Sequence, residues 1–340
     1  MGHRAGGLAV APLAVATVSL GLAGCGGVHR DHGARAQTPQ QRRPTDSARP
    51  HRGFTRVAVR SIGTLPAAVQ DAAIAPLEGR RLALLGGIDA SGVSLASVTV
   101  IASGSTATGG ALPVAQHDAQ AARLGRDVYV FGGGVVSSYD HILRYDPATR
   151  RATSAGRLPT DASDVAVASV GNTAYVVGGY DGADWLDTIV AWRPGTAPRV
   201  VARLPSGLRY AAAAASGDHL LIVGGTTPSG VSDAILSFDP VTRSVSRIGR
   251  LPAPLTHAGA ASIDGRVLVV GGRRTLDGDQ TRAILSIDPI TGRCRRAGSL
   301  DRPLSDAAVT ATATDVVVAG GLSASGARNE LLALTPRGVR

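Results

Sequence analysis

Residues 127–133 spell DVYVFGG, a short apolar run that ends in two glycines. The same pattern occurs five more times: RLALLGG (81–87), TAYVVGG (173–179), LLIVGG (220–225), VLVVGG (267–272) and VVVAGG (316–321). Successive glycine pairs are 46, 46, 46, 47 and 49 residues apart. A short, β-branched run without polar alternation predicts a strand that is buried on both faces. Six copies at a nearly constant spacing predict a repeat architecture.

Each copy also contains the signals of three further strands. An Ala-rich or alternating run precedes the apolar run, and in five copies a tight turn joins the two; these turns contain Gly79, Gly125, Gly171, Gly217 and Gly265. The sixth copy has TATD at 312–315 instead. A third strand follows the glycine pair, and in copies two to six we expect it to end in a proline turn, at Pro147, Pro194, Pro240, Pro289 and Pro336. A fourth strand then runs into a Leu-Pro pair, or into LDRP at 300–303.

Four strands per repeat and six repeats predict an all-β fold, a six-bladed β-propeller of four-stranded antiparallel blades. The double glycine, the Asp-Pro turn and the Leu-Pro pair resemble the Kelch repeat, and the resemblance covers residues 54–340. Kelch repeats usually carry a Trp in the fourth strand, where this chain has Ala152, Val245 and Cys294. We therefore expect a compact, Ala-filled variant, with Cys294 as a small buried side chain and not a reactive thiol.

The two ends of the repeat region complement each other. The region begins with a lone outer strand at 55–62 and finishes with a third strand at 330–334. The N-terminal strand therefore supplies the missing fourth strand of the last blade, which closes the ring and removes an exposed edge.

Six equivalent positions precede the inner strands: Asp71, Asp118, Asp164, Tyr210, His257 and Asp306. We expect them to encircle the mouth of the central channel, with His117 and Arg209 beside them, as candidate ligand-binding residues. Four carboxyls brought together repel one another, so at least one should have a raised pKa or attract a cation. The alternative is structural: the repeat uses Asp or His here to satisfy loop amides, as Asx turns do.

Three functions fit this architecture. The first is a binding or scaffold protein that presents its loop face to a protein or glycan partner. The second is a carbohydrate-active enzyme of epimerase or lyase type with its site at the channel mouth, since some Kelch-like proteins resemble galactose oxidase or sialic acid mutarotase. Its mark would be a deep, closed mouth and a strongly shifted pKa. The third is an accessory subunit of a transporter or cell-wall complex. No catalytic residue is identified, and we lean towards a protein that is not an enzyme.

The N-terminal residues predict where in the cell the protein is located. Residues 1–24 resemble a signal peptide whose apolar run, 8–22, is short for a permanent membrane span. LAGC at 22–25 resembles a bacterial lipobox, which implies cleavage before Cys25 and acylation of its thiol, with chains such as palmitate. Residues 26–53 hold six Arg and almost no apolar side chains, which predicts a disordered basic tether. We expect an extracytoplasmic location on a lipid anchor, and the basic tether could lie along anionic headgroups.

Composition excludes several classes of chemistry. The chain has 340 residues, a formal net charge of +10 and no lysine, so neither a Schiff-base lysine nor a P-loop lysine is present. Two cysteines, 25 and 294, exclude a disulfide framework and a multi-cysteine zinc site. Residues 54–340 hold 28 Arg against 23 acids and few aromatics, so we expect no nucleic-acid binding. We also expect no cofactor, no metal and a monomeric propeller.

Overall fold

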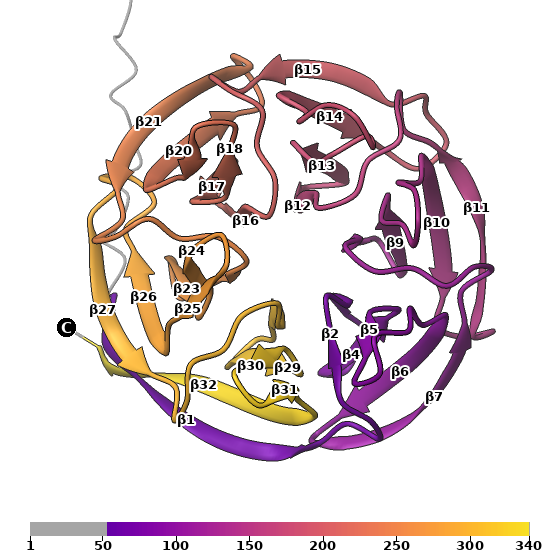
Figure 1. Ribbon diagram of the computed structural model, residues 1–340, viewed down its shortest axis with the longest axis horizontal. Coiled ribbons are helices and arrows are strands. Elements are labelled where there is room, and N and C mark those ends of the chain that lie inside the picture. The colour runs from indigo at the N-terminus through magenta and orange to yellow at the C-terminus, as the bar shows by residue number, and fades with distance from the viewer. Residues whose placement is uncertain (1–52, 340) are drawn as a thin grey trace, which may run out of the picture. The chain divides into compact units, whose positions relative to one another are not determined.

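The computed structural model describes residues 53–339, which form a closed ring of six four-stranded antiparallel blades around a central axis (Figure 1). The prediction of an all-β, six-bladed propeller is confirmed. The predicted signal peptide, Cys25 and all but the last residue of the predicted tether lie outside the described residues.

Blades one to three follow one another along the chain, each running from the axis outward. Blade one is β3 (Ala73–Pro76), β4 (Arg81–Leu85), β6 (Ser97–Ala102) and β7 (Ser105–Ala111). Blade two is β8 (Gln120–Leu124), β9 (Asp127–Phe131), β10 (His141–Asp146) and β11 (Arg151–Arg157). Blade three is β12 (Ala166–Val170), β13 (Thr173–Val177), β14 (Thr188–Trp192) and β15 (Arg199–Arg203).

Blades four and five repeat this order, and the last blade combines both ends of the described chain. Blade four is β16 (Ala212–Ser216), β17 (His219–Val223), β20 (Ala234–Asp239) and β21 (Ser244–Arg250). Blade five is β22 (Gly259–Ile263), β23 (Arg266–Val270), β26 (Ala283–Ile287) and β27 (Cys294–Ser299). Blade six is β28 (Ala308–Ala311), β29 (Val316–Ala319), β32 (Glu330–Val339) and β1 (Phe54–Thr64).

Strand β1 closes the ring as predicted. It pairs antiparallel with β32, from Phe54 opposite Val339 to Thr64 opposite Glu330. The expected end of the third strand at Pro336 is wrong for this blade, because β32 continues to Val339. The fourth strand here comes from the N-terminus, so the chain needs no reversal at Pro336 and pairing continues along β1.

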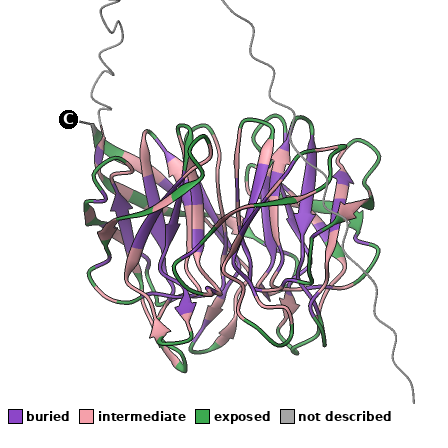
Figure 2. Cartoon of the chain, turned by 90° about the horizontal axis from the view of Figure 1, so that it is seen from above, coloured by how far each residue is buried: buried purple, intermediate pink, exposed green. Residues whose placement is uncertain are grey.

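The hydrophobic core consists of one cluster between each pair of neighbouring blades. Alternate residues of β9 show how: Val128 and Val130 pack towards blade one, whereas Tyr129 and Phe131 pack towards blade three beside Trp192. Because both faces of the blade are covered, the second strand is a continuous apolar run. Figure 2 shows this burial along the inner strands and exposure at both ends of the ring.

The double glycines link each blade to the next. A Cβ on Gly132 would lie 2.1 Å from the carbonyl oxygen of Ala162 in the following blade, and φ is +62°. Gly133 donates its N–H to the same oxygen, at 2.8 Å. A side chain at the first glycine would separate the two backbones, and the same contact recurs at all six pairs.

The ring has two different ends. The loop end carries the segments after the glycine pairs together with the Leu-Pro loops, and the turn end carries the β-turns. The segments after the glycine pairs, expected to be loops, form small hairpins in three blades: β18 (Thr226–Thr227) with β19 (Gly230–Val231), β24 (Arg273–Thr275) with β25 (Gly278–Gln280), and β30 (Leu322–Ser323) with β31 (Gly326–Ala327). In blade one, β5 (Ile88–Asp89) of this segment instead pairs with β2 (Val69–Gln70), which precedes the inner strand.

Candidate functional site

The six predicted residues meet at the axis on the loop end and form a closed ring of backbone hydrogen bonds. The N–H of each residue donates to the carbonyl of its counterpart in the preceding blade, at 2.9 to 3.2 Å. We call these residues the mouth ring: Asp71, Asp118, Asp164, Tyr210, His257 and Asp306. All six are in the left-handed region, with φ between 51° and 58°.

This conformation explains much of the residue choice. A left-handed φ is costly for most side chains, and Asp, Asn and His tolerate it best. The Asx-turn alternative does not match the geometry, because among the described residues no backbone N–H donates to the side chain of a mouth-ring aspartate. The repeat therefore places Asp or His here for backbone reasons, and Tyr210 is the position that departs from this rule.

The mouth ring encloses a cavity of about 50 Å³, lined by its own side chains and by the first residues of the inner strands. Behind it the central channel has a volume of about 280 Å³ and is lined mainly by alanines, such as those at 211–215. The predicted convergence of Ala-rich strands at the axis is thus present. The mouth ring forms the narrow opening at the loop end of that channel.

The side chains of the mouth ring associate as three neighbouring pairs. Asp71 lies beside Asp306, Asp118 lies beside Asp164, and the rings of Tyr210 and His257 stack with centroids 3.8 Å apart. Desolvation, followed by the charges of neighbouring carboxylates, raises the pKa of both Asp71 and Asp118 well above the ordinary value. The predicted raised pKa is therefore present at two of the four carboxyls.

Two arginines neutralise the other two carboxyls. Arg209 donates from Nε to Asp164, at 2.5 Å, and Arg273 donates to Asp306, also at 2.5 Å. Asp306 in addition accepts a hydrogen bond from Ser305. Arg209 was predicted from its position before the mouth ring, whereas Arg273 was not. The sequence did offer a signal for Arg273, because it directly follows the glycine pair of its blade. A backbone bridge joins Arg273 to Thr256, the residue before His257 of the mouth ring.

The remaining polar groups of the mouth are held by local contacts. Burial lowers the pKa of His257 to about 4, and the neighbouring Asp306 opposes this effect in part. Burial also raises the pKa of Tyr210. His117 accepts or donates a hydrogen bond with Ser94, at 2.9 Å, and lies 3.6 Å from Asp118. The imidazoles of the mouth therefore favour the neutral form.

A cluster that the sequence did not reveal lies next to the mouth ring. The guanidinium of Arg209 stacks 4.2 Å from the ring centroid of Tyr180 and 5.3 Å from that of Trp185. Both aromatic side chains come from the segment after the glycine pair of blade three, and both are partly exposed. We call Tyr180, Trp185 and Arg209 the aromatic cluster. Residue spacing alone could not show that Arg209, from the next blade, completes it.

The two ends of the ring differ in how their charges are paired. Nine arginines belong to the loop end, and all but Arg282 form ion pairs with acids there. Eleven exposed arginines belong to the turn end: Arg56, Arg80, Arg81, Arg126, Arg150, Arg151, Arg193, Arg199, Arg243, Arg293 and Arg337. Within residues 53–339, none of these eleven pairs with a carboxylate, but four other arginines near this end do: Arg60 with Asp315, Arg123 with Glu78, Arg144 with Asp127 and Arg266 with Asp288.

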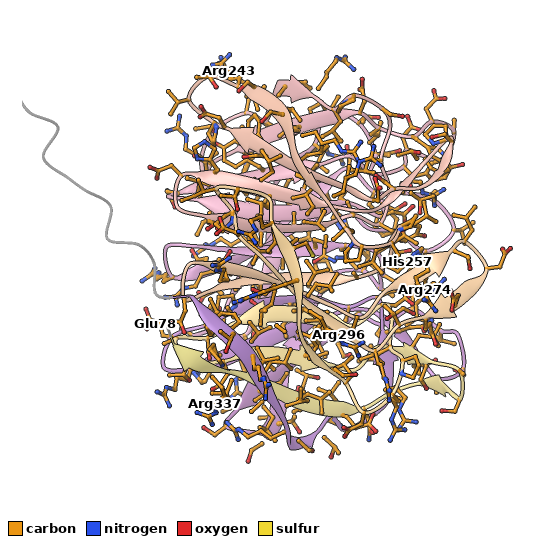
Figure 3. The ribbon with its side chains drawn as sticks, turned by 90° about the vertical axis from the view of Figure 1, so that its left-hand side faces the viewer. Glu78, Arg243, His257, Arg274, Arg296 and Arg337 are labelled. Atoms are coloured by element: carbon orange, nitrogen blue, oxygen red, sulfur yellow. The ribbon has the colours of Figure 1, made fainter. Side chains whose placement is uncertain are left out.

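Figure 3 shows the two ends of the ring from the side, with Arg243, Arg337 and Glu78 at one end and His257 and Arg274 at the other. Within the described part of the chain, no group of three or more His, Cys, Asp or Glu side chains has the geometry of a metal site. No helix of that part is long and apolar enough to cross a membrane.

The comparisons with known proteins agree with the repeats. The Kelch motif family matches residues 162–196, a stretch that contains Asp164, the glycine pair at 178–179 and the buried Trp192. The chain is a Kelch-repeat β-propeller. A solved structure of YjhT matches with a TM-score of 0.68 at 14% identity, over 81% of this chain and 99% of that one. At this identity the likeness supports the fold alone. No curated protein sequence matches the chain.

This Kelch propeller fills its core without the expected fourth-strand Trp. Ala152, Val245 and Cys294 pack against the inter-blade clusters instead. Burial raises the pKa of the Cys294 thiol to about 11, which disfavours the thiolate. Cys294 is half-buried where full burial was expected, because it lies at the start of the outermost strand of its blade, and its packing still suits the structural role predicted for it.

Proposed function

We propose that this Kelch propeller is a lipid-anchored, extracytoplasmic binding protein, without catalytic activity, that presents its loop end to a protein partner. A Kelch propeller fold favours a protein-interaction or scaffold role. Loops on a rigid ring are also where propellers can vary their contacts without disturbing the core.

The aromatic cluster is the observation that carries this proposal. Trp, Tyr and Arg dominate the energetic centres of protein interfaces, because they bury a large area and still offer polar contacts. Here the ring centroids of Tyr180 and Trp185 both lie within 5.3 Å of the Arg209 guanidinium. The ion pair between Arg209 and Asp164 fixes the arginine before a partner binds, so little side-chain entropy remains to be lost.

Exposed apolar side chains extend this surface over blades one and two. Val93, Val135 and Val136 are 57%, 44% and 99% exposed on the segments after the glycine pairs, and Val114 is 43% exposed on the Leu-Pro loop between them. Together with the aromatic cluster they give the loop end both apolar area and a polar anchor, which a protein partner requires.

The carbohydrate-active alternative is supported less well. The mouth does contain shifted pKa values at Asp71, Asp118 and His257, which is one of its two expected marks. The other mark, a deep and closed mouth, does not fit a cavity of about 50 Å³. Sites for small organic ligands commonly have volumes of about 300–1,000 Å³.

A photo-crosslinking experiment tests the proposal. A photoreactive amino acid would replace Trp185 in cells that produce the full chain, and the matched control would replace Val200, which is 45% exposed on the outer strand β15. We expect one protease-sensitive adduct from position 185 and none from position 200. A protease-resistant adduct would indicate a glycan instead. No adduct at 185, in a folded variant, would contradict the proposal.

The membrane anchor is tested separately. LAGC at 22–25 supports acylation of Cys25, so the full chain should incorporate an alkyne-labelled palmitate in cells and fractionate with membranes. The variant Cys25→Ser should do neither. Equal labelling of both forms would contradict the anchor and leave the binding proposal for the loop end intact.

A further inference from the structure

The chain enters the propeller at the turn end. Strand β1 starts at Phe54, opposite Val339, and runs to Thr64 at the loop end, where Leu65 and Pro66 follow. Residues 26–53, which connect Cys25 to the propeller, therefore join it at the turn end. The mouth ring and the aromatic cluster lie at the opposite end.

The turn end is also the cationic end. Eleven exposed arginines of this end lack acidic partners within residues 53–339 and four others near it are paired, whereas eight of the nine arginines of the loop end are paired. An unpaired guanidinium on the surface can contact an anion without first breaking an existing ion pair. This end of the ring therefore complements a surface of dense negative charge.

Three acids of the turn end help to build the proline turns. Asp146, Asp239 and Asp288 each accept N–H groups of their own proline turn, at 2.8 to 3.0 Å to the nearest donor. These hydrogen bonds lower the pKa of Asp146 and contribute to the lowered pKa of Asp239 and Asp288. These three carboxylates are thus held by the turns, while the arginines that follow, such as Arg243 and Arg293, are exposed. Three further acids of this end are exposed as well, Glu78, Asp218 and Asp264, but the unpaired arginines outnumber them.

Two of these turns also carry an exposed apolar tip. Val241 in blade four is 86% exposed and lies two residues before the unpaired Arg243. Ile290, at the equivalent position of blade five, is 78% exposed and lies three residues before the unpaired Arg293. An apolar tip flanked by arginines suits the boundary between headgroups and acyl chains. The loop end has exposed apolar side chains too, so charge and chain connection distinguish the two ends.

We propose that the turn end of the propeller is a membrane-contact surface that docks on an anionic bilayer through its unpaired arginines, with Val241 and Ile290 at the headgroup boundary. The choice of a bilayer rests on the proposed acylation of Cys25, which places the chain at a membrane and leads into this same end. The mouth ring and the aromatic cluster then face away from the bilayer, towards a partner.

Vesicle binding tests this surface without the anchor. The probe is the chain from residue 26 onward, unacylated, mixed with vesicles of phosphatidylcholine alone or with about one-third phosphatidylglycerol. We expect binding to the anionic vesicles only. Arg243→Glu should weaken it about thirtyfold, because each unit charge near an anionic surface is worth about 1 kcal/mol and the reversal changes two of them. The matched reversal at the loop end, Arg282→Glu, should change it less than about twofold.

A depth-sensitive label determines which end is in contact. In the background Cys294→Ser, a polarity-sensitive fluorophore would be attached to Ile290→Cys or, as the control, to Val136→Cys, which is 99% exposed in the native chain at the loop end. We expect brighter, blue-shifted emission at position 290 with anionic vesicles and no change at position 136. The reverse pattern would overturn the proposal.

The remaining outcomes separate this proposal from its competitors. If both arginine reversals leave vesicle binding unchanged, residues 26–53 alone bind the lipid and the proposal fails. If duplex DNA competes at equal salt and binds more tightly than the vesicles, the surface is a nucleic-acid site and the proposal fails. If palmitate labelling is absent but the label at position 290 responds, the membrane-contact surface stands and the acyl anchor fails.

Discussion

Replacing Asp118 by asparagine should stabilise the protein at neutral and alkaline pH. The Asp118 side chain is 15% exposed, and desolvation and the neighbouring Asp164 raise its pKa well above 3.8. The folded state thus holds this proton more tightly than the unfolded state does. The free energy of unfolding therefore falls as the pH rises from 3.8 through the raised pKa, and asparagine removes this loss.

The expected size follows from the same geometry. Asparagine tolerates the φ of 54° at this position, and its amide can donate to Asp164 as the protonated carboxyl does. Since leaving a buried polar group imperfectly compensated costs about 1–3 kcal/mol, we expect Asp118→Asn to raise the free energy of unfolding by about that amount at pH 8. At pH 4 the gain should be below about 0.5 kcal/mol, because little of the carboxyl ionises in the folded state.

Urea unfolding followed by tryptophan fluorescence at pH 4, 6 and 8 measures this difference. Asp181→Asn is the control with the opposite sign, because Asp181 accepts N–H groups of Ala183 and Asp184 and its pKa is lowered. That variant should lose stability at pH 8. A gain for Asp118→Asn of the same size at pH 4 and pH 8, or a loss at pH 8, would refute the reasoning.

Four further variants test the packing of the ring by the same unfolding assay. Arg209→Ala leaves the Asp164 side chain, 2% exposed, without its cation and should cost about 3 kcal/mol at pH 7; no loss would mean that the ion pair is not formed. Gly132→Ala should cost more than about 3 kcal/mol, and Gly125→Ala, where a Cβ meets nothing within 4 Å, only about 1 kcal/mol; equal losses would contradict the blade-to-blade contact. Phe54→Ala, fully buried in the closing strand, should cost about 3–5 kcal/mol and increase proteolysis at β1.

The fold was predictable because each repeat carries the same residues at the contact between neighbouring blades. The double glycine marks where one backbone must approach the next blade, a contact that only a residue without Cβ permits. Counting these pairs gives the number of blades, and the unmatched outer strand at 55–62 gives the closure. The one wrong boundary, at Pro336, arose where a strand from the other end of the chain extended the pairing.

The candidate site was predictable in position but not in chemistry. Equivalent repeat positions must lie at equivalent places around an axis, so the six residues of the mouth ring could be named from alignment of the repeats. Their pairing could not. Arg273 reaches Asp306 from the preceding blade, and Arg209 reaches Asp164 from the following one, through contacts that no spacing encodes.

The sequence by itself determined the repeat, the blade count, the closure and the ring of acidic side chains, because these depend on periodicity and on glycine at fixed places. Only the tertiary structure decided which carboxyls are neutralised, that the mouth ring encloses about 50 Å³, and that, within residues 53–339, unpaired arginines gather at the end where the chain enters. Those properties arise from distances between blades and from desolvation, which depend on residues about 45 positions apart, such as Arg209 and Asp164.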